Sequence, residues 1–440
     1  MRRRDISAAL WATATAGTTL APLRAQAQSC TLPCYPQTPA EAALGISPVA
    51  TQYPAGDVRR YGATGNGSTD DTVAITQANA VAMEAATVAH SAQNNTRVFF
   101  PAGTYLYQPS ATLQIGHQWE GESVESTLIL CNTAGYTGEF FRLTGSCEMR
   151  NLFIKCQNLV QHGLGVRIAA SDPTQFTGQV RLTRVWVQGF GTNIQADRSF
   201  LVTLDQVRSE YGNYGFYCQP GAAAPGPNAY ITTHLHLNCY YASNAVNVFY
   251  QTDVASNNVT FIGGANESAT KPFGADGSSY SSYFGNISGL HFIDLYCENQ
   301  PAALVISAAG RDVTFDGLYL NGTGGIYLGS NVSARFVGVR TTTSTDLVTG
   351  GDGTQTVSME RCSWPSAGNS TDFATATLVQ TAINGTFYSS TLPALRQGTG
   401  SPQGVLTAPV GTLYLRTDGT TGATLYVKET GTGNTGWIAK

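Results

Sequence analysis

The sequence is poor in charged residues, and those it has are not mainly basic. Only 12% of its 440 residues are charged, and 28 acidic against 24 basic residues give a formal net charge of −4. A nucleic-acid partner is therefore not expected, because a surplus of Lys and Arg supplies most of the attraction to phosphate. The sequence also lacks the abundance of Leu, Glu and Lys that is typical of helical proteins.

Patterns for metal binding and membrane insertion are missing as well. There is no CxxC, no HExxH and no group of His at ligand spacing, so we expect neither a metal nor a cofactor. Beyond the N-terminus, no stretch is long and apolar enough to span a bilayer. The nine cysteines are an odd number. Cys30 and Cys34 lie close enough to form one bridge, and most of the others are expected to be buried thiols.

The first 27 residues, 1–27, have the layout of an export signal. Arginines at positions 2–4 precede a mildly apolar stretch, and Ala25-Gln26-Ala27 is a small-residue cleavage site. The paired arginines resemble a twin-arginine signal. We therefore expect an exported protein, periplasmic or extracellular, whose mature chain begins near Gln28. Residues 28–56 are rich in Pro, Ala and Thr and are expected to form an extended arm.

The residues that are abundant are Gly, Ser, Thr and Asn, which suit many short strands joined by tight turns. Apolar anchors recur about every 22 residues, a period typical of a stacked solenoid. The anchors are Leu182, Leu204, Phe292, Phe315, Phe336 and Met359, with segments near His234 and Phe261 between the second and the third. Alternate residues after each anchor should point inward, because side chains of a strand alternate between its two faces.

Ahead of these coils, about fifty residues carry a combination of motifs. Residues 62–72 read GATGNGSTDDT, residues 70–90 have helical spacing of Ile and Ala, and residues 100–105 read FPAGTY. Together they resemble the opening of the pectate-lyase-superfamily domain in rhamnogalacturonase/epimerase-like proteins and in phage tailspike depolymerases. The resemblance implies an all-β fold, a right-handed parallel β-helix over residues 57–390, with helix 70–90 as its N-terminal cap.

The resemblance concerns the fold rather than the chemistry. In that family these motifs begin the β-helix, so Asp70 and Asp71 are expected to be cap residues and not catalysts. The polygalacturonase signature is absent from the coils, and so is an acidic calcium-binding cluster of the pectate lyase type. The catalytic residues of the family therefore do not carry over to this sequence.

The C-terminus departs from the coil pattern. Residues 391–407 read as a linker rich in Gly, Pro, Thr and Gln, and residues 408–440 contain short alternating strands around an Asp-Gly turn. So small a β module cannot bury much apolar surface by itself. We expect it to pack between chains, with a homotrimer as the favoured assembly, or else to cap its own helix.

If the repeating columns point inward, the residues between them form one outward face that carries carboxylates, aromatic rings, Arg and His. We expect this face to bind a polysaccharide, because aromatic faces suit sugar rings and Arg suits acidic sugars. Its predicted substrate-binding residues are Trp186, Arg208, Glu210, His236, Tyr240, Tyr296 and Tyr319. A face that is merely solvated remains the alternative.

Three carboxylates of this face, Glu267, Asp294 and Glu298, are the candidate catalysts. Neighbouring rungs of a sheet lie about 4.8 Å apart. Glu267 and Glu298 would then be adjacent, whereas Glu210 and Glu267 would lie two rungs apart. Retaining glycosidases hold their two carboxyls about 5–5.5 Å apart and inverting ones about 6.5–9.5 Å. The spacing therefore predicts a polysaccharide-cleaving glycoside hydrolase.

Two other functions stay open at this point. One is a lyase for an acidic glycan, in which His236 or Tyr240 removes a proton and Arg208 neutralises a uronate. The other is a non-catalytic glycan-binding or tail-like structural protein. Two further histidines, His234 and His291, fall nearer inward or corner positions and are expected to be structural.

Overall fold

The computed structural model describes residues 35–88, 97–133, 135–157, 162–219, 230–250, 255–269, 282–285, 287–299, 304–306, 312–322, 326–342, 348–349, 356–362, 377–383, 386–388 and 395–440. The expected export signal and the pair Cys30 and Cys34 lie outside these residues. Within the described part of the chain, no helix is both long and apolar enough to cross a membrane.

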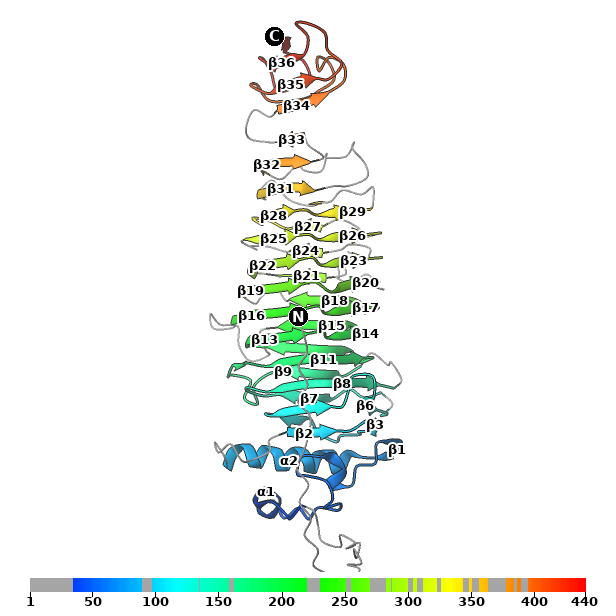
Figure 1. Ribbon diagram of the computed structural model, residues 1–440. Helices are drawn as coiled ribbons and strands as arrows, with labels where there is room; N and C mark the ends of the chain where they lie inside the picture. Colours follow the sequence, from blue (N-terminus) through cyan, green and yellow to red (C-terminus); the bar gives the residue numbers. More distant parts are fainter. Residues whose placement is uncertain are drawn as a thin grey trace, which may run out of the picture.

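Short parallel strands stack into a three-sided rod (Figure 1). A typical coil has a long strand, β16 (Tyr230–Leu237), a short strand after a bend, β17 (Tyr240–Ala242), and a third strand, β18 (Val246–Tyr250). The long and short strands belong to one 23-stranded sheet, sheet A, that covers two sides of the rod. The third strands form the ten-stranded sheet B. The expected right-handed parallel β-helix is confirmed.

Each side of the rod is built from strands of successive coils. The long-strand side of sheet A holds β11 (Arg181–Gln188), β13 (Ser199–Asp205), β16, β19 (Ala255–Ile262), β22 (Ile287–Ile293), β25 (Val313–Asp316), β28 (Ser333–Val337) and β31 (Thr356–Cys362). The short-strand side holds the end of β11, β14 (Arg208–Glu210), β17, β20 (Ala265–Glu267), β23 (Tyr296–Glu298), β26 (Tyr319–Asn321) and β29 (Arg340–Thr341). Sheet B holds β4 (Leu113–Ile115), β7 (Glu139–Leu143), β9 (Leu164–Ile168), β12 (Thr192–Asp197), β15 (Tyr214–Gln219), β18, β21 (Ser282–Phe284), β24 (Leu304–Ile306), β27 (Ile326–Leu328) and β30 (Val348–Thr349). The remaining strands of sheet A are β1 (Asn66–Asp70), β2 (Arg97–Phe100), β3 (Gly103–Leu106), β5 (Gln118–Gly121), β6 (Thr127–Cys131), β8 (Glu148–Cys156), β10 (Thr177–Gly178), β32 (Thr377–Ile383) and β33 (Thr386–Tyr388).

Stacked side chains fill the inside of the rod. Phe261, Phe292, Phe315 and Phe336 stack on successive rungs with ring centroids 4.6–5.2 Å apart. Such aromatic pairs contribute roughly 0.5–1.5 kcal/mol each beyond the area that they bury. The seven described cysteines, Cys131, Cys147, Cys156, Cys218, Cys239, Cys297 and Cys362, are buried thiols, as expected.

For one coil, the apolar pattern of the sequence predicted a register that is wrong by two residues. His236, and not His234, pairs with Leu204 on one side and with Phe261 on the other. Both histidines point inward and both are buried. Because they share the same parity, alternation alone did not show at which residue this coil bends.

In coil after coil, the residue at the bend between the long and the short strand has a left-handed backbone conformation. Asp294, Gly317 and Gly338 occupy this corner in three neighbouring coils, with φ of 51°, 69° and 61°. Gly enters this region without strain, and Asp is one of the side chains that tolerate it. Asp294 therefore sits at a corner and not on the short strand.

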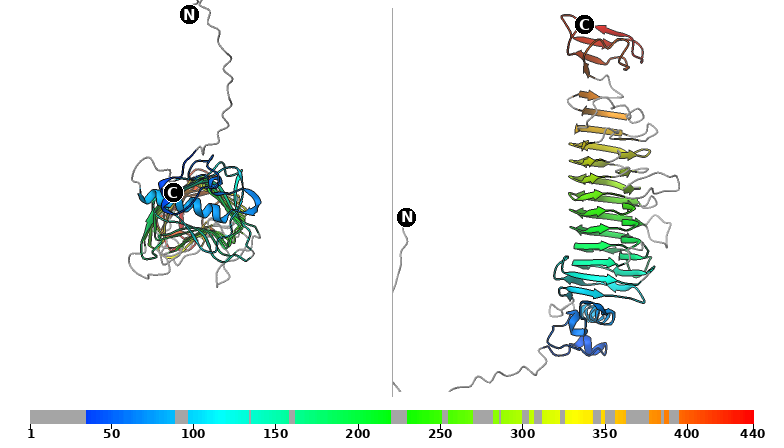
Figure 2. Two further views of the ribbon diagram at one scale, coloured as in Figure 1. Left: turned by 90° about the horizontal axis from the view of Figure 1, so that it is seen from below. Right: turned by 90° about the vertical axis from the view of Figure 1, so that its right-hand side faces the viewer.

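Helix α2 (Thr72–Val88) lies across the N-terminal end of the rod, as expected for a cap (Figure 2). Its buried face includes Ile75, Ala78 and Ala82. Asp70 caps it by accepting a hydrogen bond from the Thr72 amide at 2.9 Å. Asp71 instead accepts from the amide of Thr64 at 2.7 Å, so it holds the loop before the helix.

The expected extended arm, residues 28–56, is not extended throughout. It contains helix α1 (Pro39–Ala43), which Thr38 begins with a capping box. The 3-10 helix η1 (Val58–Tyr61) follows, and its Arg60 pairs with Glu41 at 2.6 Å where both side chains are fully buried. This pair ties the arm to the rod, which the Pro-rich composition did not indicate.

The C-terminal module forms a separate small sheet at the far end of the rod (Figure 2). Its strands are β34 (Leu395–Gly398), β35 (Leu413–Arg416), β36 (Leu425–Lys428) and β37 (Trp437–Ala439). The first of these comes from the segment expected to be a linker. One face of the sheet covers a core of Tyr414, Tyr426 and Trp437. The side chains of Leu413, Leu415 and Ile438 are exposed.

Candidate functional site

Two outward columns run along the short-strand side of the rod. The aromatic column consists of Trp186, Arg208, Tyr240, Ala265, Tyr296, Tyr319 and Arg340 on consecutive rungs. The carboxylate column consists of Gln188, Glu210, Ala242, Glu267, Glu298 and Asn321. Their outward direction follows from the alternation of side chains along each short strand, whose middle residues are buried.

His236, a predicted substrate-binding residue, is not on this face. Only 1% of it is exposed, and its ring nitrogens lie 2.7 Å from Tyr241 Oη and 3.0 Å from Tyr250 Oη. Burial lowers the pKa of His236 well below its usual range. His236 can therefore neither touch a substrate nor act as a base here. The coil that contains His236 has Ala242 in the carboxylate column, on the rung after Glu210.

At the end of the face near Trp186, the side chains of the face pack against one another. The indole of Trp186 stacks on Phe153 with centroids 4.0 Å apart, and the Arg208 guanidinium lies 4.1 Å from the indole centroid on the next rung. Arg208 donates to Glu210 at 2.9 Å, and this hydrogen bond raises the pKa of Arg208. Glu210 is only 4% exposed. These three predicted binding residues thus engage one another.

Glu267 and Glu298 are adjacent on the open part of the face, as their spacing predicted. β20 and β23 are in register at these two residues, and Glu210 lies two rungs from Glu267. Tyr240 Oη donates to Glu267 Oε2 at 2.9 Å. The side-chain amide of Asn321 donates to Glu298 Oε1 at 3.1 Å. Each carboxylate therefore accepts a hydrogen bond from a neighbouring side chain, and both remain half-buried at the surface.

Tyr240 is a hydrogen-bond donor and not a base in this arrangement. Burial, and then its hydrogen bond to Glu267, raise the pKa of Tyr240 to about 12. The phenol therefore keeps its proton at neutral pH. Neither of the two bases considered for a lyase, His236 and Tyr240, is thus suited to that role.

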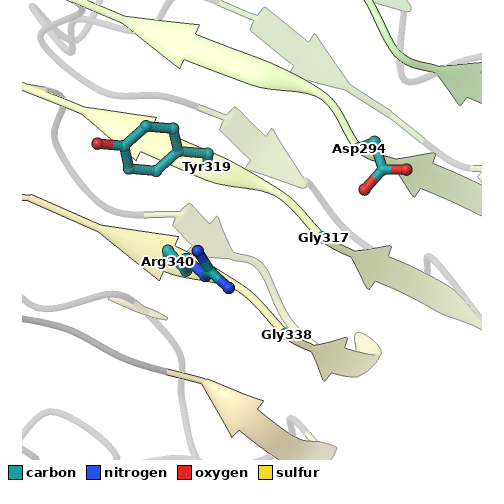
Figure 3. A pocket seen from close by; sticks show the side chains of 5 residues that line it. All are labelled: Asp294, Gly317, Tyr319, Gly338 and Arg340. Atoms are coloured by element: carbon teal, nitrogen blue, oxygen red, sulfur yellow. The ribbon is translucent and has the colours of Figure 1, made fainter.

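Asp294 belongs to a different part of the face from the glutamates. It precedes Glu298 by four residues, which span roughly 13 Å of extended chain. With Gly317, Tyr319, Gly338 and Arg340 it lines a pocket of about 480 Å³ (Figure 3). A Cβ on Gly317 would lie 2.2 Å from Asp294 Oδ1, so this glycine makes room for the carboxylate. The three candidate catalysts therefore do not form one cluster.

Arg340 is a site residue that sequence reasoning did not single out. It follows Tyr319 in the aromatic column, and Tyr319 in turn lies 5.6 Å from Tyr296 between ring centroids. Its side chain is exposed, and no ion pair to it is present within the described coils. The alternation of side chains along the strand places Arg340 on the outward face, on the rung after Tyr319. This pattern could have identified Arg340 from the sequence.

These features define a parallel β-helix protein with a polar and aromatic face on one side, which carries a pocket beside Tyr319. The family model for rhamnogalacturonase A/epimerase, pectate lyase-like proteins matches residues 56–283, more than half of the chain. The chain therefore belongs to this family. A comparison of the sequence with curated proteins finds no match.

Several solved structures are similar to this chain at low identity. The ORF18 protein of Geobacillus virus E2 is 14% identical, with a TM-score of 0.45, over 74% of this chain and 60% of its own length. The A-module of an Azotobacter vinelandii mannuronan C-5 epimerase, AlgE6, is 13% identical, with a TM-score of 0.47, over 74% of this chain and 98% of that one. An Acinetobacter phage tailspike is 10% identical, with a TM-score of 0.48, over 82% of this chain and 70% of that one. This chain thus spans less than two thirds of the first of them, and no function is transferred from likenesses so distant.

Proposed function

We propose that this protein binds and cleaves a polysaccharide as a glycoside hydrolase. The observation that carries the proposal is the register of β20 and β23, which sets Glu267 and Glu298 on neighbouring rungs of an outward strand. Neighbouring rungs lie about 4.8 Å apart, close to the roughly 5–5.5 Å between the carboxyls of retaining glycosidases. Membership of a family named for rhamnogalacturonase and epimerase supports a carbohydrate substrate.

A retaining mechanism gives the two carboxyls different tasks. One protonates the departing glycosidic oxygen, and the other attacks the sugar carbon as a carboxylate and forms a glycosyl-enzyme. We assign the attack to Glu267, because the phenol of Tyr240 holds one of its oxygens in place at 2.9 Å. Glu298 then donates the proton, and later takes one from the water that releases the product.

Tyr296, Tyr319 and the pocket beside them are proposed to hold the sugars next to the cleaved bond. Tyr319 is 39% exposed, so its ring can stack on a sugar. Arg340 and Asp294 line the same pocket and offer a cation and an acceptor for polar groups of the chain. Trp186, Arg208 and Glu210 then act as a packed wall rather than as direct contacts.

The test of this function is a panel of neutral and acidic polysaccharides, assayed for new reducing ends and for ultraviolet absorbance. A hydrolase releases reducing ends without absorbance, whereas a lyase leaves an unsaturated, absorbing product. We expect reducing ends alone. If every polysaccharide is left intact but one of them binds, the non-catalytic alternative replaces the hydrolase.

Replacement of Arg340 by Ala is expected to weaken substrate binding and to leave the turnover rate nearly unchanged. A charge-assisted hydrogen bond contributes about 1.5–3 kcal/mol, so KM should rise roughly 10- to 100-fold on an acidic substrate. Steady-state kinetics of cleavage measure this split. Arg335→Ala on the long-strand side, where the side chain is 63% exposed, is the matched control and should leave KM unchanged.

Replacement of Leu413 and Leu415 by Lys is expected to break self-association if the module joins chains. Both side chains lie on one face of β35, and their cross-strand partners Val427 and Leu425 extend the same aliphatic patch. Two buried charges would make such an interface unfavourable. Light scattering should show a trimer for the parent and a monomer for the variant. Val405→Lys, at a site 79% exposed, is the control, and a monomeric parent would contradict the trimer.

A further inference from the structure

The outward side of sheet B carries a second ordered surface, on a different side of the rod from the proposed cleavage site. Its members occupy consecutive rungs and share one parity, while the residues on either side of each in its strand are mostly buried. We name it the sheet-B surface. It consists of Arg142, Arg167, Gln195, Tyr217, Phe249 and Tyr283.

The arginine end of this surface opens on a cavity of about 170 Å³. Its charged lining residues are Arg142, Arg167, Asp197 and Arg198, and Ala169, Ala170, Pro173 and Gln175 complete the lining. Ion pairs hold the guanidinium groups in place. Arg142 donates twice to Glu139, each time at 2.6 Å. Arg167 donates to Glu139 at 3.1 Å and to Asp197 at 2.6 Å.

This network holds more hydrogen-bond donors than its carboxylates accept. The guanidinium groups of Arg142 and Arg167, with five donors each, pair with the carboxylates of Glu139 and Asp197. Arg198, which donates to the carbonyl oxygens of Pro173 and Thr174, adds a third positive charge, so these five groups together carry a charge of +1. The Nη1 atom of Arg142 makes no hydrogen bond to any described residue. A rigid guanidinium with unused donors in a cavity suits an oxyanion, to which arginine can donate two parallel hydrogen bonds.

The other end of the surface is aromatic. The rings of Tyr217 and Phe249 stack with centroids 5.3 Å apart, and those of Phe249 and Tyr283 with centroids 4.9 Å apart. Tyr214 packs beside Tyr217 at 4.8 Å. These rings are half-buried. Gln195 lies one rung from Arg167 and one rung from Tyr217. It is buried, and its side-chain amide donates to Asp197 at 3.0 Å, so it supports the ion pairs at the arginine end.

We infer that the sheet-B surface binds an acidic oligosaccharide without cleaving it. The cavity takes a carboxylate or sulfate group of the saccharide, and the sugars that follow lie along Tyr217, Phe249 and Tyr283. From Arg142 to Tyr283 the surface spans five rungs, roughly 24 Å, enough for several sugar units. Sugars present apolar ring faces and polar edges, which match stacked rings and guanidinium groups in one line.

The inference does not depend on cleavage at the other face, and its test separates the two. All proteins carry Glu298→Gln and Arg340→Ala, so that the short-strand side does not cleave the saccharide and Arg340 cannot bind it. Titration calorimetry then measures binding of a linear uronic-acid trisaccharide, a neutral trisaccharide of the same length and a single uronic acid. Arg142→Gln and Phe249→Ala are the variants, and Arg361→Gln, exposed on sheet A, is the charge-matched control.

Distinct patterns are expected from the two variants. Arg142→Gln should weaken binding of both the acidic trisaccharide and the single uronic acid by roughly tenfold or more, because it removes a charge-assisted contact. Phe249→Ala should weaken only the trisaccharide. The neutral trisaccharide should bind at least roughly tenfold more weakly than the acidic one. The control should match the parent background, and melting temperatures check that each variant is folded.

Three results would overturn the inference. Equal affinity of the acidic and neutral trisaccharides would show that the cavity does not bind an oxyanion. Unchanged trisaccharide binding in folded Arg142→Gln and Phe249→Ala would place the saccharide elsewhere. A fall in molecular mass of Phe249→Ala in light scattering, with saccharide binding intact, would show that the surface is an interface between copies of the chain.

Discussion

Replacement of Glu298 by Gln is expected to lower the rate of polysaccharide cleavage by about a thousandfold or more. A positioned acid or nucleophile supplies several powers of ten, about 4 kcal/mol of transition-state stabilisation, and the amide can neither donate the proton nor attack. Glu267→Gln should have the same effect. Both side chains are at the surface, so the free energy of unfolding should change by less than about 0.5 kcal/mol. Initial rates and thermal melting measure the two quantities.

Two controls sharpen this result. Glu360→Gln, on the long-strand side with the side chain 51% exposed, makes the same chemical change and should leave the rate alone. Glu210→Gln should lower stability more than rate, because Glu210 is buried and pairs with Arg208. If both Glu267→Gln and Glu298→Gln keep the parental rate on a substrate that the parent cuts, the glutamate pair is not catalytic. Asp294 in its pocket would then be the next candidate.

Stability is expected to fall steeply as the pH drops below about 6.5. His234 and His236 are buried inside the rod, joined by Tyr250, which lies 3.2 Å from His234 Nδ1 and 3.0 Å from His236 Nε2. Burial lowers the pKa of His234 to about 3 and that of His236 well below its usual range. Only the unfolded chain takes up these protons near pH 6.5. Each histidine should therefore lower the free energy of unfolding by about 1.4 kcal/mol for every pH unit below 6.5, until the pH reaches the pKa of that histidine in the folded protein.

The variant His236→Gln isolates this effect. An amide can still bond the hydroxyls of Tyr241 and Tyr250, but it takes up no proton on unfolding. Between pH 6.5 and 4.5 its stability should fall less steeply than that of the parent by about 1.4 kcal/mol per pH unit. Denaturant titrations at several pH values give the two slopes. His162→Gln, at an exposed position, is the matched control. Parallel slopes for parent and His236→Gln would show that this histidine does not resist protonation in the folded state.

Much of the architecture was readable from local patterns. The motifs of residues 62–72 and 100–105 predicted the capped β-helix, and the 22-residue recurrence of apolar anchors predicted its stacked coils. The adjacency of Glu267 and Glu298 also followed, because each lies at the same distance after the apolar anchor of its coil, Phe261 or Phe292, and these anchors pair on neighbouring rungs. In each case the pattern repeats, so a single misread residue does not change the outcome.

Other features depended on where each coil bends and on what packs over a side chain, and only the folded chain showed them. Alternation assigns a parity to His234 and His236 but not the residue at which the strand turns, so His236 was misplaced outward. The same limit hid the corner position of Asp294, which takes it away from the glutamates. Trp186 has the outward parity that was predicted, yet Phe153 and Arg208 cover its ring. A side chain's direction is a local property of its strand, whereas its exposure depends on neighbours about twenty to thirty residues away, which the coils bring together.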